Sequence, residues 1–226
     1  MQKQKSIILL SGGMDSLVTL AIAIDKGYIP YVLHLNYSQN TQEKELKAFN
    51  SICNYYSLLE KQRLIINIDY LKKIGGTSLI DVDKFHSCKE ENNINVPDSY
   101  VPFRNANILA IGTSWAEVIG ANAIFIGASQ IDYSGYPDCR RVFFDAFEKT
   151  ILYGTKEDTN IKIITPLINM SKEDIVRNGI RLKVPFDLSW SCYYSSDYAC
   201  GKCDSCKLRL KGFKNVGIKD PILYKN

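Results

Sequence analysis

The sequence lacks a long hydrophobic run. No apolar stretch approaches the roughly 18 residues that a membrane-spanning helix requires, so we expect no membrane partner. The apolar run near the N-terminus, 6–10, is stopped by Gly12 and Gly13 and is too short for the core of a signal peptide. These two absences together predict a cytoplasmic protein.

Neither sign of charge is in large excess. The 226 residues include 28 Lys and Arg against 24 Asp and Glu, which gives a net charge of +4. The basic residues are scattered, whereas a dedicated nucleic-acid binder usually carries a basic cluster, so we expect no direct nucleic-acid partner. With 46% hydrophobic and 23% charged residues, the composition excludes the disordered and fibrous classes.

Histidine is scarce, with His34 and His86 alone in the chain. His34 ends an expected strand and His86 falls in a long loop, and both are predicted to be structural or solvent-facing. No other obvious nucleophile or general base stands out. The sequence therefore favours catalysis by positioning and electrostatics.

What the chain does have is a regular alternation of short apolar runs and helical periodicity. The expected strands lie at 6–10, 31–35, 64–68, 123–126 and 161–167. The first of these runs is continuously apolar, as is typical of a strand buried on both faces. The alternation predicts an α/β fold with a doubly wound, parallel, five-stranded sheet and right-handed crossovers.

The loop 11–16, with the sequence Ser-Gly-Gly-Met-Asp-Ser, joins the first expected strand to the first expected helix. Unpaired N–H groups and the helix dipole attract an anion to such a helix start. Glycines let the main chain come close to the anion, and Ser11 and Ser16 add hydroxyl donors. Asp15 is repelled by phosphate itself and is expected to hold a bridging Mg²⁺. The alternative is an ordinary turn with a helix cap, and the ending of a Walker motif is missing.

Four of the seven cysteines crowd into 15 residues near the C-terminus: Cys192, Cys200, Cys203 and Cys206. In a cytosolic chain such crowding suggests a metal before disulfides. Four thiolates fill a tetrahedral zinc shell and leave no open position, which predicts one structural Zn²⁺. An iron–sulfur cluster is the alternative, although the Cys-Pro that continues the ferredoxin pattern is absent. Cys53 lies on an apolar helix face and is predicted to be core packing.

Two parts follow from this reading. Residues 1–185 are predicted to form a nucleotide-binding α/β domain, and 186–226 a zinc-binding helical appendix. Residues 70–102 interrupt the rhythm with Gly75 and Gly76, an Asn-rich stretch and two prolines. A loop of this length inside a compact domain is usually functional or disordered, so we predict a lid-like insertion there.

The segment 132–140, Asp-Tyr-Ser-Gly-Tyr-Pro-Asp-Cys-Arg, follows the expected strand 123–126. Ligands bind at the carboxyl ends of strands in this fold. Asp138 can accept from the N–H edge of a guanine-like base, Tyr136 can stack on its ring, and Arg140 can hold a carboxylate or phosphate. Arg104 enters an expected helix start, where a cation can face a ligand. An ordinary strand-to-helix loop is the alternative for both segments.

Taken together, these segments resemble the 7-cyano-7-deazaguanine synthase family. The matching stretches are 10–16, 100–105, 132–140, 166–172 and 190–206, so the resemblance spans nearly the whole chain. The loop 11–16 alone is similar to the pyrophosphate-binding loop of ATP pyrophosphatases. Two departures are visible: Phe103 stands where the family has a small residue, and Asn-Tyr-Ser-Gln-Asn at 36–40 replaces Asp-Tyr-Gly-Gln-Arg.

The resemblance implies a reaction of queuosine biosynthesis. ATP adenylates 7-carboxy-7-deazaguanine, because AMP is a far better leaving group than oxide, and ammonia then displaces AMP to give an amide. A second adenylation, on the amide oxygen, permits loss of AMP and formation of 7-cyano-7-deazaguanine. The implied cofactors are Mg²⁺ with ATP and one structural Zn²⁺, and the implied assembly is a homodimer.

The same resemblance implies three sets of residues, which overlap at two positions. The catalytic set, expected to place Mg²⁺ or to neutralise charge in the transition state, is Asp15, Arg104, Arg140 and Lys172. The set expected to hold ATP and its pyrophosphate is Leu10, Ser11, Gly12, Gly13, Met14, Asp15, Ser16 and Leu17. The set expected to bind the deazaguanine is Asp132, Tyr136, Asp138 and Arg140.

Three alternatives stay open at this point. A paralogue could use the activated acid on a different amine, either a protein or a small molecule. A tRNA-modifying ATP pyrophosphatase could share the loop, although no basic face or added RNA-binding domain is visible. A zinc-bearing nucleotide sensor would show no turnover with ATP and candidate acids.

Overall fold

The structure, a computed structural model, describes residues 3–80, 96–131 and 135–225. Within these ranges the chain forms a five-stranded, fully parallel sheet in the order β3-β2-β1-β4-β5. The strands are β1 (Lys5–Leu9), β2 (Ile29–Asn36), β3 (Arg63–Asn67), β4 (Ala123–Ile126) and β5 (Lys162–Ile164). The helices are α1 (Met14–Asp25), α2 (Gln42–Tyr55), α3 (Tyr70–Ile74), α5 (Arg104–Ile119), α6 (Arg141–Gly154), α7 (Lys172–Arg181) and α8 (Asp204–Val216). The predicted α/β class is confirmed.

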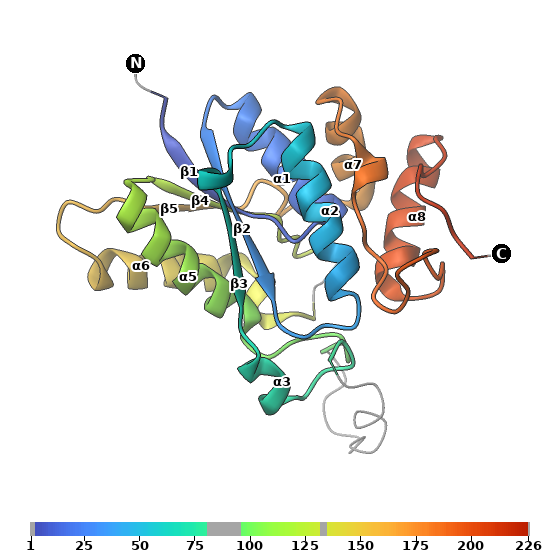
Figure 1. The fold of residues 1–226 in the computed structure, drawn as a ribbon, viewed down its shortest axis with the longest axis horizontal. Helices are drawn as coiled ribbons and strands as arrows, with labels where there is room; N and C mark the ends of the chain where they lie inside the picture. Colours follow the sequence, from blue (N-terminus) through green and yellow to red (C-terminus); the bar gives the residue numbers. More distant parts are fainter. Residues whose placement is uncertain (1–2, 81–95, 132–134, 226) are drawn as a thin grey trace.

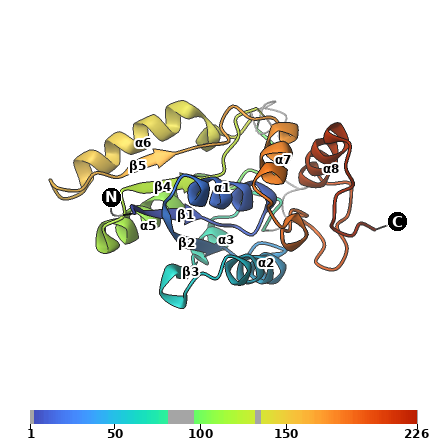
Figure 2. The ribbon, with the colours of Figure 1, turned by 90° about the horizontal axis from the view of Figure 1, so that it is seen from above.

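The chain begins at the centre of the sheet and builds outward in two directions. β1 pairs with β2 on one side and with β4 on the other, so the strand order reverses between β1 and β4. Helices cover both faces: α1 and α2 lie over one, and α5 and α6 over the other (Figures 1 and 2). This is the predicted doubly wound arrangement, in which ligands bind where the strand order reverses.

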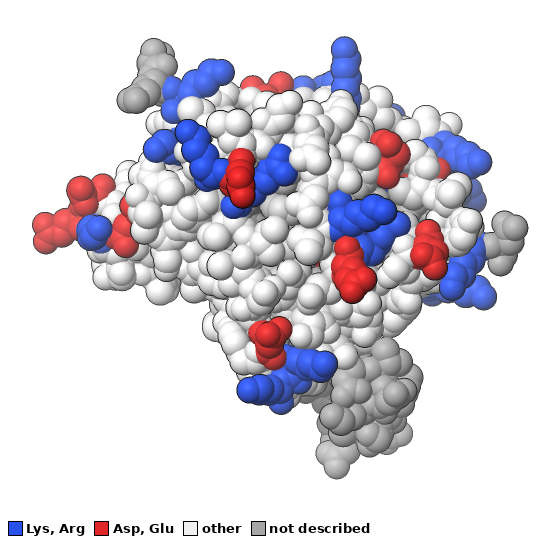
Figure 3. All heavy atoms as spheres, viewed as in Figure 1, with Lys and Arg blue, Asp and Glu red and all other residues white. Residues whose placement is uncertain are grey.

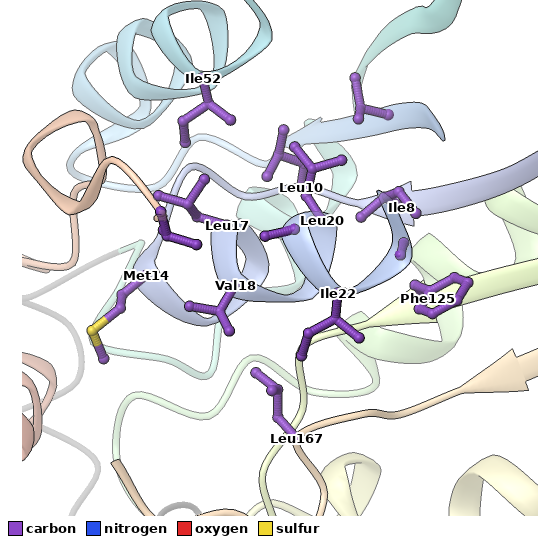
Figure 4. Packing of buried hydrophobic residues seen from close by; sticks show 14 of the residues in the cluster. Ile8, Leu10, Met14, Leu17, Val18, Leu20, Ile22, Ile52, Phe125 and Leu167 are labelled. Carbon is purple, nitrogen blue, oxygen red and sulfur yellow. The ribbon is translucent and has the colours of Figure 1, made fainter. Parts of the chain in front are cut away.

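Alternate side chains of β1 supply two separate cores. Ile8 packs with Leu17 and Leu20 of α1 and with Phe125 of β4 (Figure 4). Ile7 points to the opposite face and joins the cluster beneath α5 and α6. Both isoleucines are fully buried. A strand flanked by two cores needs apolar side chains at every position, which is why its sequence does not alternate.

Two segments differ from the sequence prediction. β5 covers Lys162–Ile164 instead of 161–167, because Pro166 has no N–H to continue the ladder. The insertion 70–102 is not wholly a loop: it begins with α3, and Leu79 and Val101 pack into a small cluster at the end of the sheet. Residues 81–95, including His86, lie outside the described residues, and the lid remains a prediction.

The C-terminal segment shares the core of the sheet. α8 packs against α7, and Phe213 joins the same cluster as α1. The buried guanidinium of Arg209 donates to both carboxylate oxygens of Asp220 at 2.7 and 3.0 Å, which ties α8 to the end of the chain. The proposed division between residues 185 and 186 is not tested by this packing and stays a prediction.

The surface carries charges of both signs. On the face drawn in Figure 3, basic and acidic side chains are interspersed over a mostly uncharged surface. None of the helices described is both long enough and apolar enough to cross a membrane.

Candidate active site

A cleft of about 240 Å³ opens at the carboxyl ends of β1, β2 and β4. Its walls come from the loop after β1, the segments after β2 and β4, the start of α5, the start of α7 and the C-terminal segment. The polar lining residues include Ser11, Asp15, Ser16, Tyr37, Gln39, Thr41, Glu45, Arg104, Asn105, Lys172, Ser191 and Arg209. The cleft therefore lies where the fold class predicts a ligand.

The loop 11–16 is shaped by its glycines and its own hydroxyls. Gly12 adopts a φ of +89°, and a Cβ there would lie 2.6 Å from the main-chain oxygen of Glu45, so only glycine fits. The Ser16 hydroxyl donates to the Gly13 carbonyl at 2.9 Å, and the Gly13 N–H donates to Ser11 Oγ at 3.2 Å. The first N–H groups of α1 have no partner within the helix. This arrangement can bind an anion.

Of the eight residues predicted to hold pyrophosphate, five line the cleft and three do not. Ser11, Gly13, Met14, Asp15 and Ser16 line the cleft. The side chains of Leu10 and Leu17 are fully buried in the core (Figure 4), so a contact from them to a nucleotide can come only from the main chain. Gly12 packs against α2 and acts through the shape of the turn.

His34 supports this loop from below. Its Nδ1 lies 3.0 Å from the Leu10 carbonyl oxygen, and its Nε2 lies 3.1 Å from Asn36 Oδ1. The ring is 1% exposed, and burial lowers the pKa of His34 below 6.5. The prediction that His34 is structural agrees with this position.

Asp15 and Lys172 form an ion pair across the cleft although 157 positions separate them. Lys172 Nζ lies 2.6 Å from Asp15 Oδ2, and the Lys172 side chain is 6% exposed. The other carboxylate oxygen, Asp15 Oδ1, is buried and has no hydrogen-bond partner among the described residues. An orphaned anionic oxygen beside a phosphate-type loop is the kind of ligand that Mg²⁺ prefers, so this oxygen fits the predicted Mg²⁺.

Lys172 is placed by the helices around it. It is the first residue of α7, which Ser171 caps: Ser171 Oγ accepts from the Asp174 N–H at 3.2 Å, and Asp174 Oδ2 accepts from the Ser171 N–H at 3.0 Å. α8 crosses directly over it, because a Cβ on Gly212 would lie 2.9 Å from Lys172 Cβ. This capping box fixes the start of α7, and the C-terminal segment fixes a residue of the cleft.

Arg104 enters the cleft from the first turn of α5. Its Nη1 donates to the hydroxyl of Tyr37 at 3.1 Å. Burial raises the pKa of Tyr37, so the hydroxyl stays neutral and accepts this bond. Phe103, just before the helix, has a φ of +58°, a conformation that favours glycine. This backbone conformation explains why the family has a small residue where this chain has Phe103.

Asp138 lies behind the cleft wall instead of lining it. Its Oδ2 accepts the Asn105 main-chain N–H at 3.0 Å, and its carbonyl accepts from Asn105 Nδ2 at 2.9 Å. The carboxylate therefore caps the start of α5 in the described contacts. Burial raises the pKa of Asp138. The predicted reading of a guanine edge by Asp138 is untested by these contacts.

The other residues predicted to bind substrate are not brought together. Tyr136 lines the cleft, is 5% exposed, and shares a 2.6 Å hydrogen bond with the Ser99 hydroxyl. Arg140 is exposed, precedes α6 and is not among the residues that line the cleft. Asp132 lies outside the described residues.

The four C-terminal cysteines converge as the spacing predicts. Their sulfur atoms all lie within 4.8 Å of one another, and none of them is in a disulfide. Tetrahedral zinc–sulfur bonds would place sulfurs about 3.8 Å apart. Main-chain N–H groups of Cys203 and Lys202 donate to Cys200 Sγ at 3.3 and 3.4 Å, a contact that favours thiolate. This cluster can hold a metal ion.

Sequence reasoning missed Glu45 and Cys139, among other residues that line the cleft. Glu45 from α2 accepts hydrogen bonds from Thr41 and Gln39, but nothing in its local sequence marks it. Cys139 lies within the segment 132–140, but its sequence context assigns it no role. Burial raises the pKa of Cys139 to about 11, so its thiol stays protonated and is a poor nucleophile. Cys53 is fully buried, which confirms its predicted core position.

Comparison with known proteins agrees with this site. A 7-cyano-7-deazaguanine synthase from Chlorobium phaeobacteroides (strain DSM 266) is 56% identical over 220 residues, which is 97% of this chain and 96% of that one. A second from Chlorobium chlorochromatii is 54% identical over the same length and shares. The crystal structure titled 4-thiouridine synthetase–RNA complex with bound ATP has a TM-score of 0.50 at 22% identity, over 80% of this chain and 41% of that chain, and shows the fold alone.

The family itself is defined by the match of residues 5–217 to the model described as queuosine biosynthesis protein QueC. That match runs from the first strand to the end of α8 and includes the loop 11–16 and all four clustered cysteines. The chain is therefore an enzyme of the QueC family of queuosine biosynthesis, in which its relatives are named 7-cyano-7-deazaguanine synthase.

Proposed function

We propose that this protein converts 7-carboxy-7-deazaguanine and ammonia into 7-cyano-7-deazaguanine with the consumption of two ATP. The observation that supports this most directly is the cleft, in which an anion-binding loop, the Asp15–Lys172 pair and Arg104 lie together in a member of the QueC family. Each adenylation releases pyrophosphate, so the site must hold three phosphates and then let two of them leave.

The chain supplies the groups that such a step requires. The N–H groups at the start of α1 and the hydroxyls of Ser11 and Ser16 hold the departing pyrophosphate. Lys172 and Arg104 neutralise charge on the phosphate and on the carboxylate that attacks it. No covalent bond to the protein is needed, because AMP activates both the acid and the amide.

Asp15 is the residue that we assign to Mg²⁺. Its Oδ1 is buried without a described partner, whereas Oδ2 is neutralised by Lys172. Mg²⁺ bound there would neutralise phosphate charge and orient the pyrophosphate for departure. Asp15 itself positions both the metal and Lys172.

We assign Zn²⁺ to the four-cysteine cluster, with a structural role. The set of four sulfurs leaves no open position for water or substrate. Cys203→Ser should lower the zinc content and the free energy of unfolding together, because binding of a structural metal contributes directly to folding. Metal analysis that finds iron and sulfide, or no metal in a fully stable protein, would contradict this assignment.

We also propose that the protein is a cytoplasmic homodimer. α6 leaves Val142, Leu152 and Tyr153 more than 60% exposed, which supports burial against a second copy. Sedimentation at micromolar concentration should give twice the chain mass. A monomer at every concentration contradicts the dimer.

The function is tested by mass spectrometry of the reaction products. Purified protein is supplied with ATP, Mg²⁺, an ammonium salt and 7-carboxy-7-deazaguanine. We expect the nitrile, together with AMP and pyrophosphate in a 2:1 ratio to it. ADP and phosphate as the only nucleotide products, or nitrile formed without ATP, would overturn the proposal. An adenylated acid that reacts only with another amine would support the paralogue instead.

A further inference from the structure

The proposed reaction requires a group that accepts protons beside the nitrogen. Ammonium carries four hydrogens, and the nitrile nitrogen carries none. One proton leaves to give ammonia, one as the amide forms with loss of AMP, one as ATP adenylates the amide oxygen, and one as AMP leaves to give the nitrile. Four protons therefore depart from one nitrogen, while the phosphates leave as AMP and pyrophosphate.

The cleft offers few groups that can receive them. Two carboxylates, Asp15 and Glu45, line it among the described residues. Asp15 is paired with Lys172 at 2.6 Å, so one of its carboxylate oxygens is already occupied by a cation. Cys139 and Tyr37 hold their own protons because burial raises the pKa of each. Glu45 is the other lining carboxylate, and its described hydrogen-bond partners are the neutral side chains of Thr41 and Gln39.

Glu45 is rigidly held with acceptor capacity to spare. Its Oε1 accepts from Thr41 Oγ1 at 2.7 Å, and its Oε2 accepts from Gln39 Nε2 at 3.0 Å. Gln39 is itself fixed, because its Oε1 accepts the Tyr37 N–H at 2.9 Å. Each carboxylate oxygen has two acceptor positions, so each keeps one for an incoming N–H.

The groups around Glu45 are compatible with a base that repeatedly gains and loses a proton. Arg104 from α5 and the Tyr37 hydroxyl are the titratable groups that face it, and burial raises the pKa of Glu45 above its ordinary value. A carboxylate buried in this way accepts a proton more readily than an exposed one does, although the Arg104 charge acts in the opposite direction. It can then pass each proton to water at the open side of the cleft.

We propose that Glu45 binds the ammonium ion and accepts the protons that its nitrogen loses on the way to the nitrile. This inference rests on the proposed function. It makes Glu45 a catalytic residue of amide and nitrile formation, and it gives Glu45 no part in the first adenylation, which involves no nitrogen.

Glu45→Gln separates those two stages. The variant keeps an oxygen for the Thr41 hydroxyl but loses the negative charge and the base. Acid-dependent exchange of labelled pyrophosphate into ATP should stay within about threefold of the unaltered enzyme, since it reports the first adenylation alone. Nitrile formation should fall at least about 100-fold, the usual contribution of a positioned base. The residual rate should rise with pH in proportion to free ammonia.

Glu43→Gln is the matched control, because Glu43 is exposed on the same helix. It should leave both rates unchanged. If Glu45→Gln does not fold, Glu45→Asp is measured instead and should retain exchange while slowing nitrile formation about tenfold. Equal loss of exchange and nitrile formation in a folded variant, or no loss of either, overturns the inference. If the unaltered enzyme gives neither exchange nor nitrile, the proposed function fails instead.

Discussion

The loop 11–16, which lines the cleft, and the C-terminal segment 190–225, which contains the four-cysteine cluster, are built in opposite ways. The first leaves polar groups facing a cleft, including the buried oxygen Asp15 Oδ1 that no described residue contacts. The second turns its polar groups inward, with sulfur atoms accepting main-chain N–H groups from within the same loop. The proposed pyrophosphate site must leave polar groups without protein partners so that they can bind the ligand, whereas the proposed structural metal site must not.

The two regions are nevertheless joined. The Trp190 N–H donates to the Gly12 carbonyl at 2.9 Å, and α8 rests on Lys172 through Gly212. The C-terminal segment thereby supports the loop 11–16 and the cleft beside it. Substitutions in the loop 11–16 should change the reaction rate without changing stability. Substitutions in the C-terminal segment should change stability before they change the rate.

The largest effect is expected from Asp15→Asn. It removes the charge that holds Lys172 and the orphaned oxygen assigned to Mg²⁺, so acid-dependent release of AMP should fall at least about 100-fold. The melting temperature should change less than the rate, because the amide of the variant keeps an oxygen that can accept from the buried Lys172 Nζ. Chromatography of the spent nucleotide measures the rate. Asp25→Asn, at the exposed end of the same helix, is the control. A rate close to that of the unaltered enzyme would remove Asp15 from the mechanism.

Arg209→Met tests the C-terminal segment. Its guanidinium is 1% exposed and pairs with Asp220, so the substitution leaves a buried carboxylate unpaired and should cost about 3–5 kcal/mol of unfolding free energy. Urea unfolding measures the loss. Lys207→Met, on the exposed face of α8, should have no such effect. Because Asp220→Asn removes the stranded charge, adding it to Arg209→Met should recover part of the stability, and no recovery would speak against the ion pair as the cause.

Gly212→Ala probes the contact between the regions. The added methyl would lie 2.9 Å from Lys172 Cβ, so α8 must shift, at a cost of about 1–3 kcal/mol. Because Lys172 moves with it, we expect the KM for ATP to rise several-fold as well. Gly154→Ala meets nothing within 4 Å and serves as the control. A loss of stability with unchanged nucleotide kinetics would show that α8 does not position Lys172.

Asp138→Asn distinguishes a helix cap from a reader of substrate. As a cap, Asp138 stabilises α5 through the Asn105 N–H, and the Asn amide oxygen can accept the same bond, so stability should fall by less than about 1 kcal/mol and affinity for 7-carboxy-7-deazaguanine should stay within threefold. Calorimetry with the acid and with ATP measures both affinities. A tenfold loss for the acid alone, at unchanged stability, would support the direct reading predicted from the sequence.

The smallest effect concerns His34. Its folded-state pKa lies below 6.5 because of burial, so the unfolded chain binds the proton first as pH falls. The contribution of His34 to the free energy of unfolding is fully present above pH 6.5. It is lost as the pH falls toward the lower folded-state pKa, by at most about 1.4 kcal/mol per pH unit. Urea unfolding at pH 7.5 and 5.5 should show a smaller difference for His34→Gln than for the unaltered protein. Equal differences would mean that His34 does not contribute.

Much of the fold was predictable because its signals are local. Apolar runs and helical spacing located the strands and helices, since each depends on neighbours a few positions away. The strand predicted at 161–167 was too long because the pattern of apolar residues continues past the point where Pro166 ends the ladder.

The sequence by itself determined the phosphate-type loop and the cysteine cluster. Both are short segments whose conformation follows from glycine freedom, hydroxyl donors and ligand spacing. Only the tertiary structure placed Lys172 on Asp15, Glu45 beside Tyr37, and Asp138 under α5 instead of in the cleft. These residues come from elements that the sheet order brings together, and no local pattern encodes which side chains meet across a parallel sheet whose strands are far apart in the chain.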